Sequence, residues 1–314
     1  MSDLRQIPLW TDDPQTPAEI TRHTAFKATW PLFTEFLYKE GKSEHTITAF
    51  TGDLQLVAEH LGGSKPIGQF TTTDLNRFLN WLENGRGVPC SRKSYARRVT
   101  TLKVFFKWLH GLAAIPDDPA KPVLQRSGPA PLSHVLSQPQ IKAAIIAARG
   151  MRKKDEQDYR PELLFRLLLD TGIKKSEASH LTPQSIDKTN PDHPVLMVRQ
   201  KFRNIYKERR IPLDPDWLHL LNEYQIQYQP KDAIFDCTPR NLEYILTAVG
   251  EQAEIPFKLS FEVMRWTCAV RDYRMGMEER DLREKLGLSE TSWYETGMKI
   301  KRLAERIAQE EARK

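Results

Sequence analysis

Two residues near the C-terminus have side chains suited to phosphate chemistry. Arg265 ends the segment LSFEVMR, and Tyr294 ends the later segment SWY. A guanidinium group binds two oxygens of a phosphate at once, because its planar fork matches their spacing. A tyrosine hydroxyl can act as a nucleophile and form a covalent intermediate. The pair therefore indicates attack by a tyrosine on a phosphodiester that an arginine holds.

The distribution of charge indicates a nucleic-acid partner more clearly than its total does. The 314 residues include 47 Lys and Arg against 41 Asp and Glu, for a net charge of +6. Basic residues gather in two runs, residues 91–110, which contain no acid, and residues 199–210, where Glu208 is the one acid. A clustered basic face is typical of nucleic-acid binding, although solvated charge on an ordinary surface gives the same pattern.

The cysteines exclude a metal centre of the usual spacing. Cys90, Cys237 and Cys268 are far apart and odd in number. We therefore expect no metal and no other cofactor, and a reduced, cytoplasmic location. No stretch approaches the ~20 apolar residues of a membrane span. The N-terminal segment has no long apolar run and does not resemble a signal peptide, so no membrane partner is expected.

The alternation of helical and proline-rich stretches predicts two domains with flanking segments. At this length each domain can bury its own core. The first is predicted to be wholly helical, because its apolar residues recur at helical spacing, and the second to mix helices with a small β-hairpin. The expected segments are a flexible arm (1–20), a helical domain (21–120), a linker (121–138), a mixed domain (139–297) and a C-terminal amphipathic helix (298–314).

Capping residues predict where the helices of the first domain begin. Ser43 and Ser91 are expected N-caps, and Thr73 or Asp74 is expected to cap the helix between them. In the second domain, residues 195–198 and 210–213 are predicted as short strands joined by a basic turn. The tail repeats Ile300, Leu303 and Ile307, which is the pattern of an amphipathic helix.

Five segments carry a resemblance to a known family. They are SEHTITAF (43–50), the helix 94–109 with IPDDPA (115–120), LLLDTGIKKSE (167–177), KERRIPL (207–213) and LSFEVMR (259–265). In this order, over nearly the whole chain after the arm, they resemble the tyrosine recombinase, or phage integrase, family. No single segment is decisive, but five in order are hard to produce by chance.

The resemblance implies a mainly α protein with a SAM-like core-binding domain and a mixed α/β catalytic domain, which together clamp double-stranded DNA. It implies that a tyrosine attacks a DNA phosphodiester, forms a 3′-phosphotyrosyl link and releases a 5′-hydroxyl. The link conserves the bond energy, so neither a metal nor ATP is needed. It also implies a homo-oligomer on DNA, in which the C-terminal helix docks on a neighbouring copy.

Carried over residue by residue, the resemblance gives an incomplete catalytic set. Arg265 falls on the second arginine position and Tyr294 is the tyrosine candidate. The first arginine position holds Lys174, which keeps the charge but loses the fork. The position three before Arg265, usually His or Lys, holds Glu262. The later His or Trp position holds Leu288, which has no hydrogen-bond donor on its side chain.

The basic runs supply the remaining expected site residues. The hairpin lysine, which in the family protonates the leaving oxygen, is either Lys201 or Lys207, with a slight preference for Lys201. A helix N-terminus favours phosphate through its dipole and its free N–H groups. The expected DNA contacts are Arg92, Lys93 and Arg97 in the first two turns of one helix, and Arg203 and Lys207 in the hairpin.

Three functions fit the sequence. The first is a DNA-binding member of the family whose strand-exchange chemistry is weakened or lost. The second is an active site-specific recombinase for which Lys174, Arg265 and Tyr294 suffice. The third, from another class, is a helical transcriptional regulator or scaffold without ancestral chemistry, in which these three residues do not converge.

Overall fold

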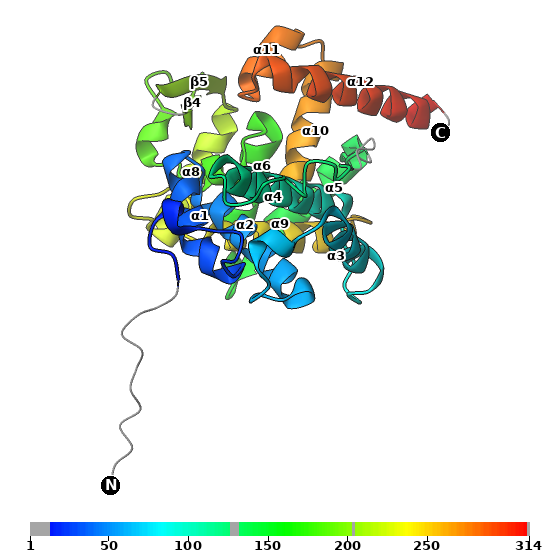
Figure 1. Ribbon diagram of the computed structural model, residues 1–314. Coiled ribbons are helices and arrows are strands. Elements are labelled where there is room, and N and C mark those ends of the chain that lie inside the picture. The colour runs from blue at the N-terminus through cyan, green and yellow to red at the C-terminus, as the bar shows by residue number, and fades with distance from the viewer. Residues whose placement is uncertain (1–12, 126–131, 203–204, 313–314) are drawn as a thin grey trace. The chain divides into compact units, whose positions relative to one another are not determined.

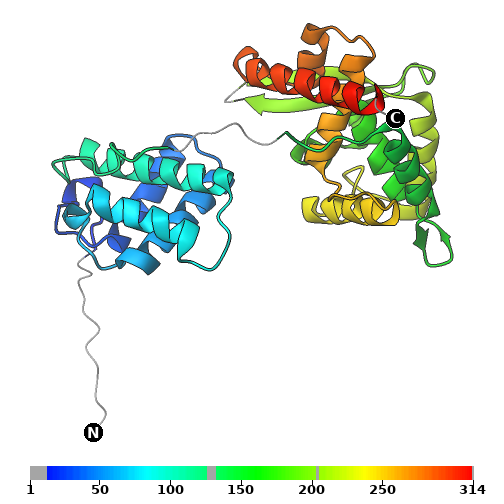
Figure 2. The same ribbon diagram turned by 90° about the vertical axis from the view of Figure 1, so that its right-hand side faces the viewer.

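The computed structural model describes residues 13–125, 132–202 and 205–312. These residues form two compact units, which divide between positions 129 and 130 and are coloured along the chain in Figure 1 and Figure 2. Each unit has its own hydrophobic core. Each unit therefore buries its own set of apolar side chains.

The first unit is wholly helical in its described residues, as predicted. Its helices are η1 (Pro17–Glu19), η2 (Lys27–Thr29), α1 (Trp30–Lys39), α2 (Glu44–Leu61), η3 (Ile67–Gln69), α3 (Thr72–Asn84) and α4 (Arg92–Gly111). Ser43 and Ser91 cap α2 and α4 as predicted. The prediction for α3 was wrong: Thr71 is the N-cap, and Asp74 returns the bond to it in a capping box.

The core of the first unit is aromatic, and one buried carboxylate joins two of its helices. Phe105 of α4 packs edge-on against Phe26 and Phe33, with ring centroids 5.3 and 5.0 Å apart. The buried carboxylate is Asp53 of α2, which accepts hydrogen bonds from Arg97 at 2.7 Å and from Thr101 at 2.9 Å. Burial raises the pKa of Asp53, and the bonds from α4 oppose that shift. These bonds fix α2 against α4.

The second unit surrounds α6 with helices and a small antiparallel sheet of order β3-β4-β5. The mainly α fold with a small sheet is thus confirmed. Its elements are α5 (Gln138–Gly150), β1 (Arg152–Lys153), β2 (Glu156–Gln157), α6 (Tyr159–Thr171), α7 (Lys175–Ala178), η4 (Pro183–Ser185), β3 (Ile186–Asp187), β4 (Val195–Phe202), β5 (Ile205–Pro212), α8 (Pro215–Tyr228), α9 (Pro239–Gln252), α10 (Phe261–Arg274), α11 (Glu279–Lys285) and α12 (Glu290–Ala312).

The hairpin of β4 and β5 is longer than predicted. The prediction of short strands around a basic turn was wrong, because both strands continue through the basic residues. Arg199 faces Glu208 across the ladder, and the two side chains form an ion pair at 2.9 Å. A cross-strand pair of opposite charges stabilises a sheet, so this contact helps the basic run to adopt a strand.

The C-terminal helix packs on the unit that contains it. α12 is continuous from Glu290 to Ala312, so it begins before the expected Met298 and includes the SWY segment. Ile300, Leu303 and Ile307 are buried against α10 and α11, and Figure 1 shows α12 beside these two helices. In the described residues, no helix is long and apolar enough to cross a membrane.

Candidate phosphate-binding site

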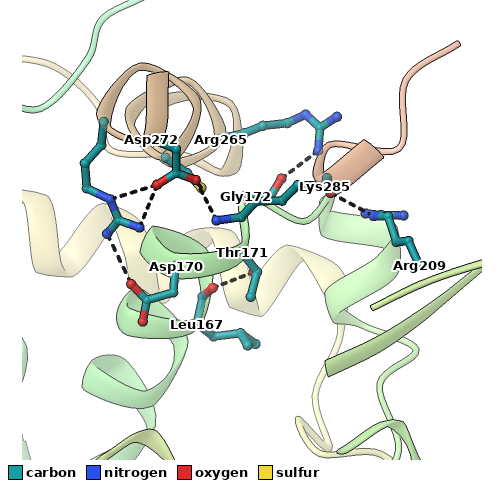
Figure 3. Close-up of polar contacts among 10 residues, drawn as sticks. Leu167, Asp170, Thr171, Gly172, Arg209, Arg265, Asp272 and Lys285 are labelled. Atoms are coloured by element: carbon teal, nitrogen blue, oxygen red, sulfur yellow. Dashed lines mark hydrogen bonds and ion pairs between the residues drawn. The ribbon is translucent and has the colours of Figure 1, made fainter. Parts of the chain in front are cut away.

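Arg265 lies at the meeting point of three elements. It projects from α10, and its Nη1 donates to the carbonyl oxygen of Gly172 at 2.6 Å, after the end of α6. Its Nη2 donates to the carbonyl oxygen of Leu286, just after α11, at 2.5 Å. Burial lowers the pKa of Arg265. Figure 3 shows the bond from Arg265 to Gly172. Among the residues that the structure describes, two of its five N–H groups donate to the protein backbone.

Two glycines allow the chain to pass close to the arginines. Gly172 and Gly287 both have positive φ, at +56° and +61°, which glycine adopts without strain. A Cβ on Gly172 would lie 3.1 Å from the sulfur of Cys268, and one on Gly287 would lie 2.8 Å from Nη1 of Arg209. A side chain at either position would therefore be strained by the positive φ and would crowd Cys268 or the guanidinium of Arg209.

Three cations, Lys174, Arg209 and Arg265, interact with one carboxylate, Glu177. Glu177 accepts two bonds from Arg209, at 3.1 and 2.7 Å, and one from the backbone N–H of Lys174 at 2.8 Å. Burial alone would raise the pKa of Glu177, but the bonds and charge of Arg209 hold it below its usual value. Burial lowers the pKa of Lys174, and the neighbouring arginines add to that shift.

Arg209 also binds the end of α11. Its Nε donates to the carbonyl oxygen of Lys285 at 2.9 Å (Figure 3). The last carbonyls of a helix carry a partial negative charge that cations stabilise. Because Arg265 binds the next carbonyl, at Leu286, two arginines together fix the position of this helix end. The segment that follows, including Leu288, is positioned by these contacts.

A second ionic network fixes α10 against its neighbours. Asp272 of α10 binds Lys285 at 2.5 Å and Arg271 at 3.1 Å. Arg271 in turn reaches Asp170 of α6 at 3.1 Å, and Figure 3 shows this chain of contacts. Cys268 is enclosed beside it, and burial raises the pKa of its thiol to about 12. The network holds α10 against α6 and α11, the two helices after whose ends Arg265 binds a carbonyl oxygen.

The two substituted positions offer no donor to a phosphate. Glu262 is exposed in the first turn of α10. Leu288 is partly buried and packs against the apolar cluster beneath α12. A carboxylate repels a phosphate, and a leucine side chain cannot donate a hydrogen bond. At the two positions where the family resemblance implies supporting donors, this chain therefore has side chains that cannot donate to a phosphate.

Tyr294 points into solvent. It lies in the first turns of α12 and is 73% exposed. Within the residues that the structure describes, its hydroxyl makes no hydrogen bond. Arg265 is close enough to Lys174 to help lower the pKa of that lysine, after the larger effect of burial. Among the described residues, no hydrogen bond or ion pair links Tyr294 to either of them. The structure thus brings two of the three candidate residues together.

The hairpin lysine remains undecided. Lys201 lies in β4 opposite Tyr206, and Lys207 lies in β5 opposite Gln200. The side chain of Lys207 is exposed. Arg203 falls outside the described residues. The assignment between Lys201 and Lys207 therefore stays a prediction.

Comparison with known proteins identifies the family. A family model described as "Phage integrase, N-terminal SAM-like domain" matches residues 31–111. A second, described as "Phage integrase family", matches residues 134–297. The chain belongs to the phage integrase family of tyrosine recombinases. Membership of this family excludes the third function, a helical transcriptional regulator or scaffold without recombinase ancestry.

Named tyrosine recombinases are similar to this chain over different lengths. Tyrosine recombinase XerC of Staphylococcus saprophyticus is 26% identical over 275 residues, which are 80% of this chain and 86% of that protein. Tyrosine recombinase XerC of Mycobacterium leprae is 30% identical over 173 residues, 55% of this chain and 56% of that protein. The match thus spans little more than half the length of this mycobacterial relative.

Solved tyrosine recombinases share the fold. A lambda integrase dimer bound to a COC′ core site matches with a TM-score of 0.67 and 13% identity, over 87% of this chain and 77% of that one. XerH bound to a palindromic difH substrate matches with a TM-score of 0.67 and 16% identity, over 85% of this chain and 78% of that one. At these identities the likeness shows the fold alone.

The first unit of this phage integrase relative contains the other expected DNA contacts. Arg92 and Lys93 are exposed in the first turn of α4. Arg97 is also exposed, but its guanidinium is held by Asp53. Arg92 and Lys93 are therefore the less constrained cations of this group, and their role stays a prediction.

Sequence reasoning did not assign Arg209 or His180 to the site. Arg209 lies within the KERRIPL segment, but its bonds to Glu177 and to a backbone carbonyl appear only in the folded unit. His180 carries no motif and follows α7 in a loop. Among the described residues, no group of His, Cys, Asp and Glu side chains has the arrangement of a metal site.

Proposed function

We propose that this chain clamps duplex DNA as a tyrosine recombinase relative in which strand-exchange chemistry is weakened or lost. Affinity for duplex DNA comes mainly from neutralised phosphates and needs many cations rather than a particular catalytic set. Arg265 and the neighbouring Lys174 supply the phosphate ligands in the second unit. Arg92 and Lys93 supply further phosphate ligands in the first unit. The protein then acts in the cytoplasm, on the nucleoid.

The loss of chemistry is inferred from one observation: the site has cations but no supporting donors and no nearby nucleophile. Glu262 and Leu288 cannot donate to a phosphate, and Tyr294 is exposed without a contact to Arg265. By analogy with oxyanion-hole deletions, each lost donor costs about 2.7–4 kcal/mol, or about 10²–10³ in rate. Such losses are not strictly additive, but these two, together with the guanidinium fork lost at Lys174, leave little turnover.

The oligomeric state is proposed with the same reasoning. A homo-oligomer on DNA is expected, because the lambda integrase in the comparison is a dimer on its DNA. Docking of the C-terminal helix on a neighbouring copy stays a prediction. It requires α12 to leave its own unit, since Ile300 and Leu303 are fully buried there.

Covalent trapping on nicked DNA tests the proposal. A library of duplexes with a nick beside the cleavage point releases the short strand and traps any phosphotyrosyl product. We expect salt-dependent DNA binding, with a log–log slope of about −0.9 for each phosphate contact, and no covalent band on a denaturing gel. An active family recombinase with its own nicked substrate serves as the positive control.

The matched variants are Tyr294→Phe and Lys174→Arg. Tyr294→Phe should bind DNA as the unmodified chain does. A covalent band that disappears in Tyr294→Phe would overturn the inactive assignment and favour a recombinase that uses Lys174, Arg265 and Tyr294. Absence of salt-dependent binding would contradict the DNA clamp itself.

A further inference from the structure

Residues 132–136, which lead into α5, form a strap on the surface of the second unit. Leu132 and Val135 pack against the apolar cluster that α12 forms with α10 and α11. Leu136 is buried in the main core of the unit, and its backbone N–H donates to Oγ1 of Thr267 in α10 at 3.0 Å. The strap is therefore held in place although it contains no helix or strand.

The last two turns of α12 contact the strap. Nη2 of Arg306 donates to the carbonyl oxygen of Ser133 at 3.3 Å. Ile307, the next residue, belongs to the apolar cluster against which the strap packs. A cavity of about 340 Å³ is lined by His134 and Val135 of the strap and by Arg306 and Ile307 of α12. The end of α12 thus lies beside the strap and binds it through a charged donor.

The end of α12 is attached to its own unit at the surface. Arg274 of α10 pairs with Glu311 at 2.6 Å, and the two side chains are 35% and 49% exposed. Water screens an exposed ion pair, which then adds little stability. Helix ends also separate from a fold at a lower free energy than its core does. The end of α12 can therefore leave the unit more easily than the centre of the helix.

The other contacts of the strap hold its two ends unequally. The ring of His134 stacks on Phe257, between α9 and α10, with centroids 4.3 Å apart. His134 is exposed, and one exposed stack does not offset the conformational entropy of four ordered residues. Leu136, in contrast, keeps its burial and its bond to Thr267 whether or not α12 is present. The end of α12 thus decides whether the chain is fixed from Leu132 or from Leu136.

We propose that the end of α12, from Arg306 onward, is a clasp on the strap that sets the length of the connection between the two units. When the clasp opens, residues 132–135 join the connection and add up to about 13 Å of reach, at about 3.3 Å per residue. Docking of α12 on a neighbouring copy would open the clasp. The use of this reach to admit a duplex rests on the proposed DNA clamp, but the clasp itself does not.

Backbone amide NMR relaxation of the free chain tests the clasp. In the unmodified chain we expect order parameters of about 0.85 at residues 132–135, the value for rigid backbone. Arg306→Ala should lower them, and a chain that ends at Glu305 should lower them below about 0.6, the value for flexible backbone. Leu136 should stay rigid in both variants, because Thr267 still binds it.

The proposal is overturned if residues 132–135 stay as rigid in both variants as in the unmodified chain. The shortened chain keeps Ile300 and Leu303, which are fully buried, and the amide signals of α5 and α10 report whether it folds. If it does not fold, Arg306→Ala alone decides, since that variant keeps the apolar side chains of α12.

Arg302→Ala is the matched control for Arg306→Ala. Arg302 is an exposed arginine about one turn earlier on α12, so its removal changes the net charge equally and should leave the strap rigid. Arg306→Lys keeps a donor and should restore part of the rigidity. Equal loosening by Arg302→Ala would overturn the clasp, because the strap would then respond to charge rather than to the bond at Ser133.

Duplex DNA distinguishes this inference from the proposed function. A strap that loosens in Arg306→Ala, in a chain that binds no duplex, would support the clasp while the DNA clamp fails. Duplex binding by a chain whose strap stays rigid in both variants would leave the DNA clamp intact and overturn the clasp.

Discussion

Replacing Glu177 by alanine is expected to lower the free energy of unfolding of the second unit by about 3–5 kcal/mol. The Glu177 side chain is 7% exposed and its ion-pair partner Arg209 is 12% exposed. Removing the carboxylate leaves a buried cation without a counter-ion, beside Lys174 and Arg265. Urea denaturation of the full chain measures the change, with hydrogen exchange in α6 and α10 reporting the second unit separately.

An exposed ion pair provides the matched control. Arg280 and Glu284 pair at 3.3 Å on the surface of α11, with side chains 80% and 57% exposed. Glu284→Ala should cost no more than about 0.5 kcal/mol. The double variant Glu177→Leu with Arg209→Met should recover much of the loss, because an apolar pair can replace a buried ion pair. A Glu177→Ala cost as small as that of Glu284→Ala would contradict the expectation.

The same residue gives the stability a pH dependence. The pKa of Glu177 is lower in the folded unit than its ordinary value, so its ion pair stabilises the fold above the unfolded-state pKa, which is about 4.3. The contribution is lost as pH falls through the lower, folded-state pKa. The difference in stability between the unmodified chain and Glu177→Ala should therefore be largest near neutral pH and shrink in acid.

Leu303→Ala is expected to destabilise the second unit by about 2–5 kcal/mol, because it opens a cavity beneath α12. Leu303 is fully buried against α10 and α11 in the same unit. If the helix packs within its own unit, the effect is independent of protein concentration. Thermal unfolding over a range of dilutions measures both the size of the loss and its concentration dependence.

The control for Leu303→Ala is an apolar residue on the surface. Ile146 of α5 is 70% exposed, and Ile146→Ala should change stability by less than about 0.5 kcal/mol. A Leu303→Ala effect that grows on dilution would show that α12 docks on another copy. Sedimentation on DNA of the chain truncated after Thr296 gives the second readout: unchanged assembly would refute docking between copies.

The sequence predicted those features of the fold that depend on local patterns. Ser43 and Ser91 identify two helix starts because a hydroxyl N-cap is a local device. The hairpin length was underestimated, since the charge of Arg199 discourages a strand until Glu208 is known to lie opposite. The start of α12 was placed too late because the buried face begins after Tyr294, whereas the helix begins before it.

The site was predictable in its residue types but not in its contacts. Lys174 and Arg265 could be found from their segments. The two carbonyls that Arg265 binds could not, because a backbone oxygen has no sequence signature. The same holds for Arg209, whose Nε binds the carbonyl oxygen of Lys285. Leu288 could be recognised as a substitution only because the family resemblance implies a His or Trp at that position.

Tyr294 and Leu303 belong to one unbroken helix, about 14 Å apart along its axis at 1.5 Å per residue. At about 100° per residue they project from roughly opposite sides, so burying one exposes the other. Turning the tyrosine inward would rotate the leucine into water. Gly297, between them, is the residue at which the helix breaks most easily. A bend at Gly297 would let Tyr294 change direction while Leu303 stays buried. In a straight helix, Tyr294 and Leu303 cannot both face the interior of the unit.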